Sequence, residues 1–262
     1  MIRPLFILLF LALDFVTVAA PTTFSNTNIV IINDSTNPPT QATPYPSSIV
    51  VAGLTGVITK VTVQIFNFSH DFPDDVDVLL VGPQGQESIL FSNVGGDIRN
   101  SITNVTLNLD ADAAAFLPSE PPLVSGAFKP TKRLDPLGFP FPVPAPAGSE
   151  GAPANLALFN GTNPNGTWNL YVVDDAAADA GIISGGWSIS VDTAPPALSI
   201  VQTGTNVIIS WPTAIAGYTL ETTPSLLSAN WSTASPPASV VSGHFIVTNS
   251  VSSISRFYRL IK

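Results

Sequence analysis

A period-two alternation of apolar and polar residues recurs along this chain and constrains its fold more than any other feature. Residues 57–65 (VITKVTVQI) place three valines and Ile65 on one face and Lys60, Thr62 and Gln64 on the other. This is the pattern of a strand with one side in water. The alternation returns at residues 76–81, 105–109, 168–173 and 187–191, and turn-forming residues separate these runs. Many short strands between turns predict an all-β protein, of the sandwich or jelly-roll kind.

Proline, at 25 of 262 residues, marks places where strands cannot continue. Proline and glycine cluster in residues 118–153, which we predict to be a long surface excursion outside the sheets, because proline donates no backbone hydrogen bond. A Pro-Pro pair at residues 195–196 predicts a stiff linker. New strand candidates follow at residues 207–211, 217–221, 244–248 and 257–261. The predicted organisation is a first β domain over residues 21–192, a linker over 193–196 and a small second sandwich over 197–262.

Residues 1–20 have the layout of a secretory signal peptide. Arg3 precedes an apolar run, and small residues close the segment at Ala19 and Ala20. The apolar run is about ten residues long, too short to span a bilayer core that needs roughly twenty. We therefore expect cleavage after Ala20 and a mature chain without a membrane span, secreted or held at the cell surface.

Charge and cysteine content narrow the functional classes. The chain has 18 acidic and 9 basic residues, a net charge of -9, and only 10% charged residues against 45% hydrophobic ones. Such a chain is too apolar to be disordered, and nine cations provide no basic stripe for nucleic acid. The absence of cysteine from the sequence excludes disulfides, zinc-thiolate sites and thiol nucleophiles.

Three stretches carry a resemblance to a known family. In residues 74–85 (DDVDVLLVGPQG) an Asp-x-Asp-hydrophobic run leads into a Gly-Pro-x-Gly turn. In residues 163–191 a Gly-x-Trp-x-Leu-x-Val strand, an acidic loop with glycine and a Trp-x-hydrophobic strand follow one another, and residues 125–130 (SGAFKP) lie between the two stretches. Together they resemble the proprotein-convertase P domain (P/Homo B) over most of residues 25–192, which implies a β jelly roll.

The C-terminal part resembles a different module. Residues 197–262 resemble a short fibronectin-type-III-like module, an immunoglobulin-type β-sandwich found at the C-terminus of secreted bacterial proteins. The resemblance depends mainly on the aromatic residues around Trp211, Trp231 and Tyr258. The full expectation is a P-domain-like jelly roll followed by a small fibronectin-type-III-like sandwich.

The P/Homo B resemblance implies an accessory role. In that family the domain packs on and stabilises a subtilisin-like serine protease. Ser-His-Asp catalysis needs a histidine base, and the only histidines, His70 and His244, lie outside any His-Gly-Thr context. No Gly-Thr-Ser-x-Ala motif is present either. We therefore expect no catalytic residues. The expected partner is a protein, by resemblance a secreted serine protease, and the alternative partner is a polysaccharide.

Two acidic groups suggest a metal site. One group follows His70, with Asp71, Asp74, Asp75 and Asp77, and the other contains Asp174, Asp175 and Asp179. Strand alternation places Asp75 and Asp77 on one face. Ca²⁺ takes six to eight oxygen ligands. We therefore predict that Asp75, Asp77 and Asp174 or Asp175 hold one calcium ion, which connects the hairpin of residues 163–191 to the strand at residues 76–81. The alternative is that these are solvated turn carboxylates capping backbone amides.

Other candidate sites have simpler interpretations. A pair of carboxylates could serve glycoside hydrolysis, but the sequence does not show the separation of the two groups. His70 lies between Phe68 and Phe72, and we predict it to be a half-buried residue at the end of a strand. The four tryptophans, Trp168, Trp187, Trp211 and Trp231, fall at core-like positions. Core packing is expected for them, although an exposed one could stack on a sugar.

Overall fold

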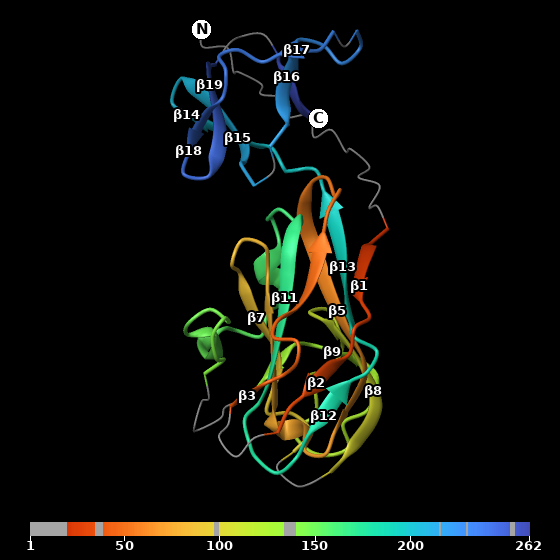
Figure 1. The fold of residues 1–262 in the computed structure, drawn as a ribbon. Coiled ribbons are helices and arrows are strands. Elements are labelled where there is room, and N and C mark those ends of the chain that lie inside the picture. The colour runs from red at the N-terminus through yellow and green to blue at the C-terminus, as the bar shows by residue number, and fades with distance from the viewer. Residues whose placement is uncertain are drawn as a thin grey trace, which may run out of the picture.

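The part of the chain that the structure describes contains β-strands and three short 3-10 helices. The computed structural model describes residues 20–34, 39–96, 100–133, 140–214, 216–228, 230–251 and 255–262, and most of the predicted signal peptide lies outside these ranges. Four sheets account for the strands (Figure 1). The all-β prediction is therefore confirmed. Among the described residues, no helix has the length and apolar character needed to cross a membrane.

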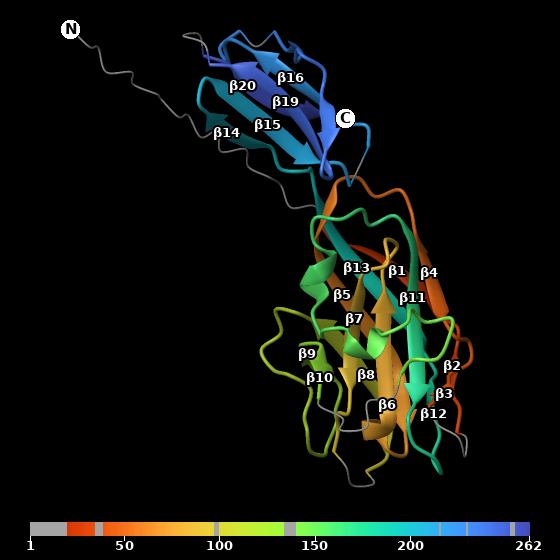
Figure 2. The same ribbon diagram turned by 90° about the vertical axis from the view of Figure 1, so that its left-hand side faces the viewer.

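The first two sheets are formed by strands that lie before residue 195. Sheet A contains β1 (Thr22–Asn26), β13 (Trp187–Ala194), β5 (Val57–His70), β12 (Gly181–Ile183) and β2 (Val30–Ile32) in that order, and β8 (Ile102–Asp110) and β9 (Gly126–Phe128) continue it from β5. Sheet B contains β10 (Thr131–Lys132), β7 (Glu87–Ser92), β6 (Val76–Val81), β11 (Gly166–Asp174) and β3 (Thr40–Gln41), and β4 (Ser47–Val51) also pairs with β11. Most strand pairs are antiparallel, but β8–β9 and β7–β10 are parallel. Figure 2 shows the two sheets from the side.

One apolar core is shared by sheets A and B. Val61, Val63 and Ile65 of β5 face it from sheet A, and the alternate residues of β6 and β11 face it from sheet B. The polar residues of β5 between them are exposed or half-buried. The predicted alternation is confirmed over residues 61–65, where every second side chain enters the core. At the start of the strand Ile58 belongs to this core and Val57 does not.

We expected the strand at residues 76–81 to have one face exposed to solvent, and that expectation is wrong. All six residues of β6 are buried. The inward ones belong to the shared core, whereas Leu79 and Val81 pack on the other face of sheet B against Phe141, Ala145 and Ala152. A strand that is buried on both faces has apolar residues at successive positions, so its sequence shows no alternation of apolar and polar residues.

The covering layer comes from the Pro-rich segment, which we predicted to be a surface excursion outside the sheets. This part of the prediction is also wrong. The segment supplies the short strands β9 and β10 and the 3-10 helix η2 (Ser149–Gly151). Its apolar side chains close the outer face of sheet B. The long apolar strands of sheet B need this cover, because their outer face would otherwise expose Leu, Val and Ile side chains to water.

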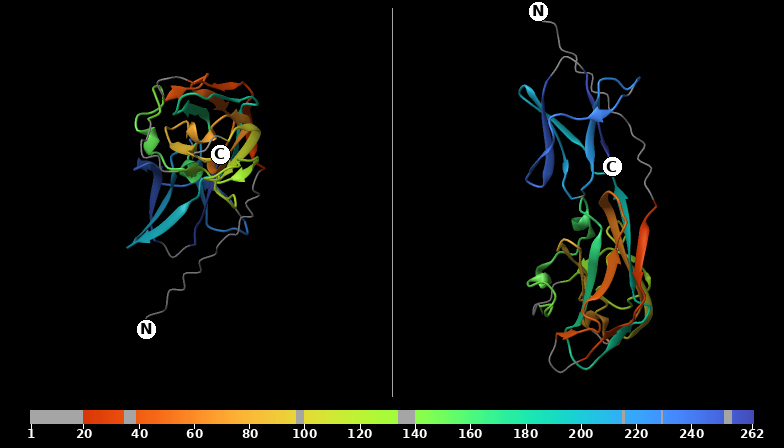
Figure 3. Two further views of the ribbon diagram at one scale, coloured as in Figure 1. Left: turned by 90° about the horizontal axis from the view of Figure 1, so that it is seen from below. Right: turned by 45° about the horizontal axis from the view of Figure 1, so that its top comes forward.

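Two smaller sheets follow β13 along the chain. One contains β14 (Ser199–Thr203), β15 (Asn206–Pro212), β19 (His244–Ser250) and β18 (Ser239–Val241), and the other contains β17 (Ser232–Thr233), β16 (Thr219–Thr223) and β20 (Phe257–Ile261). Ile209, Trp211, Leu220, Ala234 and Val247 form their core. These sheets lie beyond the C-terminal end of β13, at the end of sheets A and B opposite β12 (Figures 1 and 3).

Candidate metal centre

His70 is the last residue of β5 and lies inside the protein. It shares the inward phase of Phe68, and only 2% of its surface is exposed. The prediction that it is half-buried is therefore wrong. Gly181 of β12 pairs with it across the sheet. A Cβ at residue 181 would lie 2.1 Å from the Cδ2 atom of His70. The absence of a side chain at Gly181 is what allows the imidazole to lie against β12.

Asp174 brings a carboxylate to His70 from the opposite sheet. It is the last residue of β11 and pairs with Val76, which faces the shared core, so Asp174 projects from sheet B towards sheet A. Its side chain is fully buried, and Asp174 Oδ2 lies 3.2 Å from His70 Nε2. Its other oxygen, Oδ1, accepts a hydrogen bond of 3.1 Å from the amide of Ala176. Two residues far apart in sequence thus join the two sheets through a buried polar contact.

The other ring nitrogen of His70 faces the backbone of Phe72 and the side chain of Asp179. Nδ1 lies 2.9 Å from the carbonyl oxygen of Phe72 and 3.7 Å from Asp179 Oδ1. Asp179 lies in the connection between β11 and β12, just before Gly181. Among the described residues, His70, Asp174 and Asp179 are the group of three whose donor atoms lie close enough together to be considered for one metal ion, all within 4.8 Å.

Asp75 adds a fourth ionisable side chain to this group. It ends the 3-10 helix η1 (Pro73–Asp75), and its carbonyl oxygen accepts a 2.9 Å hydrogen bond from the amide of Asp175. Burial raises the pKa of the Asp75 carboxyl to about 7, with further increases from the charges of Asp179, Asp174 and Asp74 and an opposing effect from His70. Burial is the main cause of the raised pKa, and the neighbouring carboxylates add to it.

The structure gathers only part of the predicted calcium set. Asp75 and Asp174 lie in the cluster described above. Asp77 pairs with Val173, whose side chain packs on the outer face of sheet B, so Asp77 projects away from His70. Asp175 contributes its backbone amide to the contact with Asp75, and its side chain is buried. Neither Asp77 nor Asp175 belongs to the three-residue group.

Sequence reasoning missed two members of the cluster, His70 and Asp179. The position of His70 along the strand was the signal that we missed. His70 follows the inward-facing residues Ile65 and Phe68, beyond a bulge in β5. Asp179 offered a weaker signal, because its position depends on the fold of the connection to β12. A local sequence pattern could not have found a site that joins a histidine of sheet A to Asp174 of sheet B and to Asp179 in the connection between β11 and β12.

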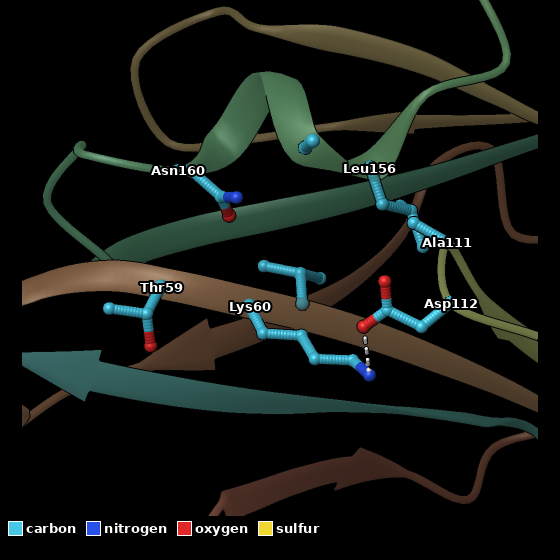
Figure 4. A pocket seen from close by; sticks show the side chains of 8 residues that line it. Thr59, Lys60, Ala111, Asp112, Leu156 and Asn160 are labelled. Atoms are coloured by element: carbon cyan, nitrogen blue, oxygen red, sulfur yellow. Dashed lines mark hydrogen bonds and ion pairs between the residues drawn. The ribbon is translucent and has the colours of Figure 1, made fainter. Parts of the chain in front are cut away.

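A separate hollow lies at the side of β5, under the 3-10 helix η3 (Leu156–Phe159). It measures about 140 Å³ and is lined by Lys60, Asp112, Leu156 and Asn160 among others (Figure 4). Lys60 Nζ lies 2.9 Å from Asp110 Oδ1 and 2.7 Å from Asp112 Oδ2. Hydrogen bonds to these two carboxylates raise the pKa of Lys60. The lysine therefore remains charged and paired, and it is unsuited to act as a base or nucleophile.

Three of the four tryptophans pack in the cores, as predicted. Trp168 and Trp187 are fully enclosed and Trp211 is 2% exposed. Trp231 is half-buried, but the guanidinium carbon of Arg259 lies 4.3 Å from its ring centroid. Arg259 is held there by Glu221 at 2.7 Å. A cation already covers this face of the indole, so it does not present an open platform for a sugar ring.

The chain matches no protein-family model, no curated protein and no solved structure. The functional argument therefore depends on the arrangement of its side chains.

Proposed function

We propose that the chain is an exported, non-catalytic binding protein that docks on and stabilises a protein partner. The supporting observation is the way its ionisable groups are used. His70 and Asp174 are enclosed between the sheets, and Lys60 is paired with two aspartates. These three side chains stabilise the fold by contacting other residues of the protein. We therefore infer that the protein acts by binding a partner at its surface. The resemblance to the P/Homo B domain suggests a subtilisin-like serine endopeptidase as the partner.

The surface proposed for docking is the outer face of sheet A, which we name the polar face. It carries exposed or half-buried hydroxyl and amide side chains from four adjacent strands: Thr23, Ser25, Thr62, Gln64, Asn108 and Ser190. The charges at its margin, Lys60 and Asp110, neutralise each other at 2.9 Å. The outer face of sheet B is closed by the Pro-rich segment. The polar face is therefore the broad sheet surface that a partner can reach in this part of the protein.

A stabilisation assay tests the protease proposal. A purified secreted subtilisin-type protease is heated with and without an excess of the mature protein, and its inactivation half-life is measured. We expect the half-life to increase, because a partner that binds only the folded state stabilises it by mass action. Gln64→Arg should remove the effect, whereas Gln202→Arg, at an exposed glutamine of β14, should retain it. An unchanged half-life, together with no complex in sedimentation, would count against a protease partner.

A neutral polysaccharide is the second candidate partner, and the chemistry of the polar face favours it. Only Thr23 and Ser190 of the named side chains hydrogen-bond each other, at 2.7 Å. The others offer donors and acceptors without charge, which suits the hydroxyl groups of an uncharged glycan. Retarded migration in native gels containing soluble starch, xylan or β-glucan, abolished by Gln64→Arg, would support this partner over the protease.

A further inference from the structure

We propose that His70, Asp174 and Asp179 form a binding site for Zn²⁺ or a similar divalent transition-metal ion. The ion would connect β5 to β11 and to the connection between β11 and β12. The site goes beyond the docking function and does not depend on it. It lies at the end of sheets A and B away from the C-terminal sheets (Figure 1). The described geometry gives three reasons for the assignment: the hydrogen-bond partners of the histidine, the spacing of the donor atoms and the balance of charge.

The backbone of Phe72 offers Nδ1 of His70 a partner in either tautomer. Its amide donates to Nδ1 at 3.1 Å, and its carbonyl oxygen lies 2.9 Å from the same atom. When Nδ1 carries the proton, this carbonyl oxygen accepts it. Metal-ligating histidines almost always donate their second ring N–H in this way to a carbonyl or carboxylate. Nε2 is then left as the ligand, facing the buried carboxylate of Asp174.

The spacing of the donors suits one small ion. His70 Nε2 and Asp174 Oδ2 are 3.2 Å apart. Two ligands at about 2.0–2.2 Å from a tetrahedral zinc ion lie about 3.3 Å apart. All three donor atoms fall within 4.8 Å. Ligands on opposite sides of such an ion are separated by at most about 4.4 Å. Asp179 Oδ1 lies 3.7 Å from Nδ1, so the Asp179 carboxylate must rotate towards Nε2 to become the third donor.

The balance of charge favours a cation over further hydrogen bonds. Three carboxyl groups, those of Asp75, Asp174 and Asp179, lie around one imidazole. Asp174 is fully buried, and Asp75 and Asp179 are partly exposed. A divalent ion bound by Asp174 and Asp179 would neutralise both carboxylates, as buried carboxylates require.

The donor set distinguishes zinc from calcium. Calcium takes six to eight oxygen ligands, whereas this site offers one imidazole nitrogen and the carboxylates of Asp174 and Asp179. Asp77 and Asp175, which the sequence assigned to calcium, lie outside the three-residue group. Imidazole combined with carboxylate is a donor set of zinc and of neighbouring transition metals. We therefore assign the site to Zn²⁺, with Co²⁺ as its spectroscopic substitute.

A titration of the full mature chain tests the assignment. The purified protein is stripped with a chelator, dialysed and titrated calorimetrically with ZnCl₂ and, separately, with CaCl₂. We expect one zinc ion per chain and no competing calcium heat. The chain has two histidines and no cysteine, so His70→Gln and His244→Gln form a matched pair. His70→Gln should weaken zinc at least ~100-fold, because loss of outer-shell partners alone costs 10–100-fold. His244→Gln should leave the affinity unchanged.

Two further measurements keep the test decisive if His70→Gln does not fold. Asp179→Asn, in the connection before β12, should also weaken zinc at least ~100-fold for the same reason. Co²⁺ added to the stripped wild type should give visible d–d absorption that Asp179→Asn diminishes and His244→Gln retains. Calcium binding without zinc binding would overturn the proposal. So would zinc binding that survives Asp179→Asn or that depends on His244.

Discussion

Replacing Gly181 with alanine is the sharpest perturbation of the buried cluster that keeps its ionisable groups. Gly181 opens β12 and pairs with His70 across sheet A. A Cβ added there would meet His70 Cδ2 at 2.1 Å, the carbonyl oxygen of Ser69 at 2.5 Å and His70 Cγ at 2.9 Å. Non-bonded carbon atoms prefer separations of about 3.5–4.0 Å. The ring or the strand must therefore move by more than 1 Å.

Neither neighbour can move freely. The Ser69 carbonyl belongs to the backbone of β5, which is paired on both sides, and the His70 ring is held by Phe72 and Asp174. The cost should therefore lie at the upper end of the overpacking range, about 3 kcal/mol. For a β unit of this size, about 2–4 °C per kcal/mol gives a fall in Tm of about 6–12 °C.

Differential scanning calorimetry of Gly181→Ala measures this loss, and Gly151→Ala is the matched control. Gly151 lies in η2, where an added Cβ meets no atom within 4 Å and the backbone has no positive φ. The control should melt with the wild type. If Gly181→Ala also melts with the wild type, the contact between β12 and His70 is not tight and the rigid cluster described here is wrong. If both variants lose stability equally, the effect belongs to glycine replacement in general.

Three other predictions follow from the same packing. In chelator-treated protein, the pKa of about 7 at Asp75 lies above its unfolded value. Stability should therefore fall by about 2 kcal/mol, discounted for partial exposure, as the pH rises from about 4 to 7. Urea unfolding of Asp75→Asn should lack this fall. Trp168→Ala should cost about 3–5 kcal/mol, against less than half as much for the half-buried Trp231, measured by urea unfolding. Phe141→Ser, but not Phe116→Ser at a 62% exposed position, should increase binding of a hydrophobic dye, because it opens the cover over sheet B.

The sequence predicted those parts of the fold that depend on local pattern. Alternation located β5, β8 and β13 because each has one face in the core and one face in water. It could not reveal that β6 is covered twice, since the cover comes from residues 140–154, more than fifty positions further along the chain. The Pro-rich composition argued against sheet pairing, yet two short parallel strands form where the chain between prolines is long enough.

The cluster was predictable only in outline. Acidic residues in two separate stretches indicated that β6 and the hairpin after β11 meet, and the structure brings Asp75 and Asp174 into one corner. Which carboxylates converge depends on the register between β6 and β11, which places Asp174 inward and Asp77 outward. A shift of one residue would exchange them. The participation of His70 depends on the distance between sheets A and B, which no local pattern contains.

The Pro-rich layer over sheet B gives the N-terminal part of the protein a front and a back. A fluorophore, biotin or surface linkage attached to the back, for example at Val143, which is 81% exposed, should leave the polar face clear for a ligand in solution. Attachment on the front, at Gln64, should block it. Orientation on a sensor surface thus becomes a property that can be chosen by one cysteine substitution, because the chain has no cysteine of its own to compete.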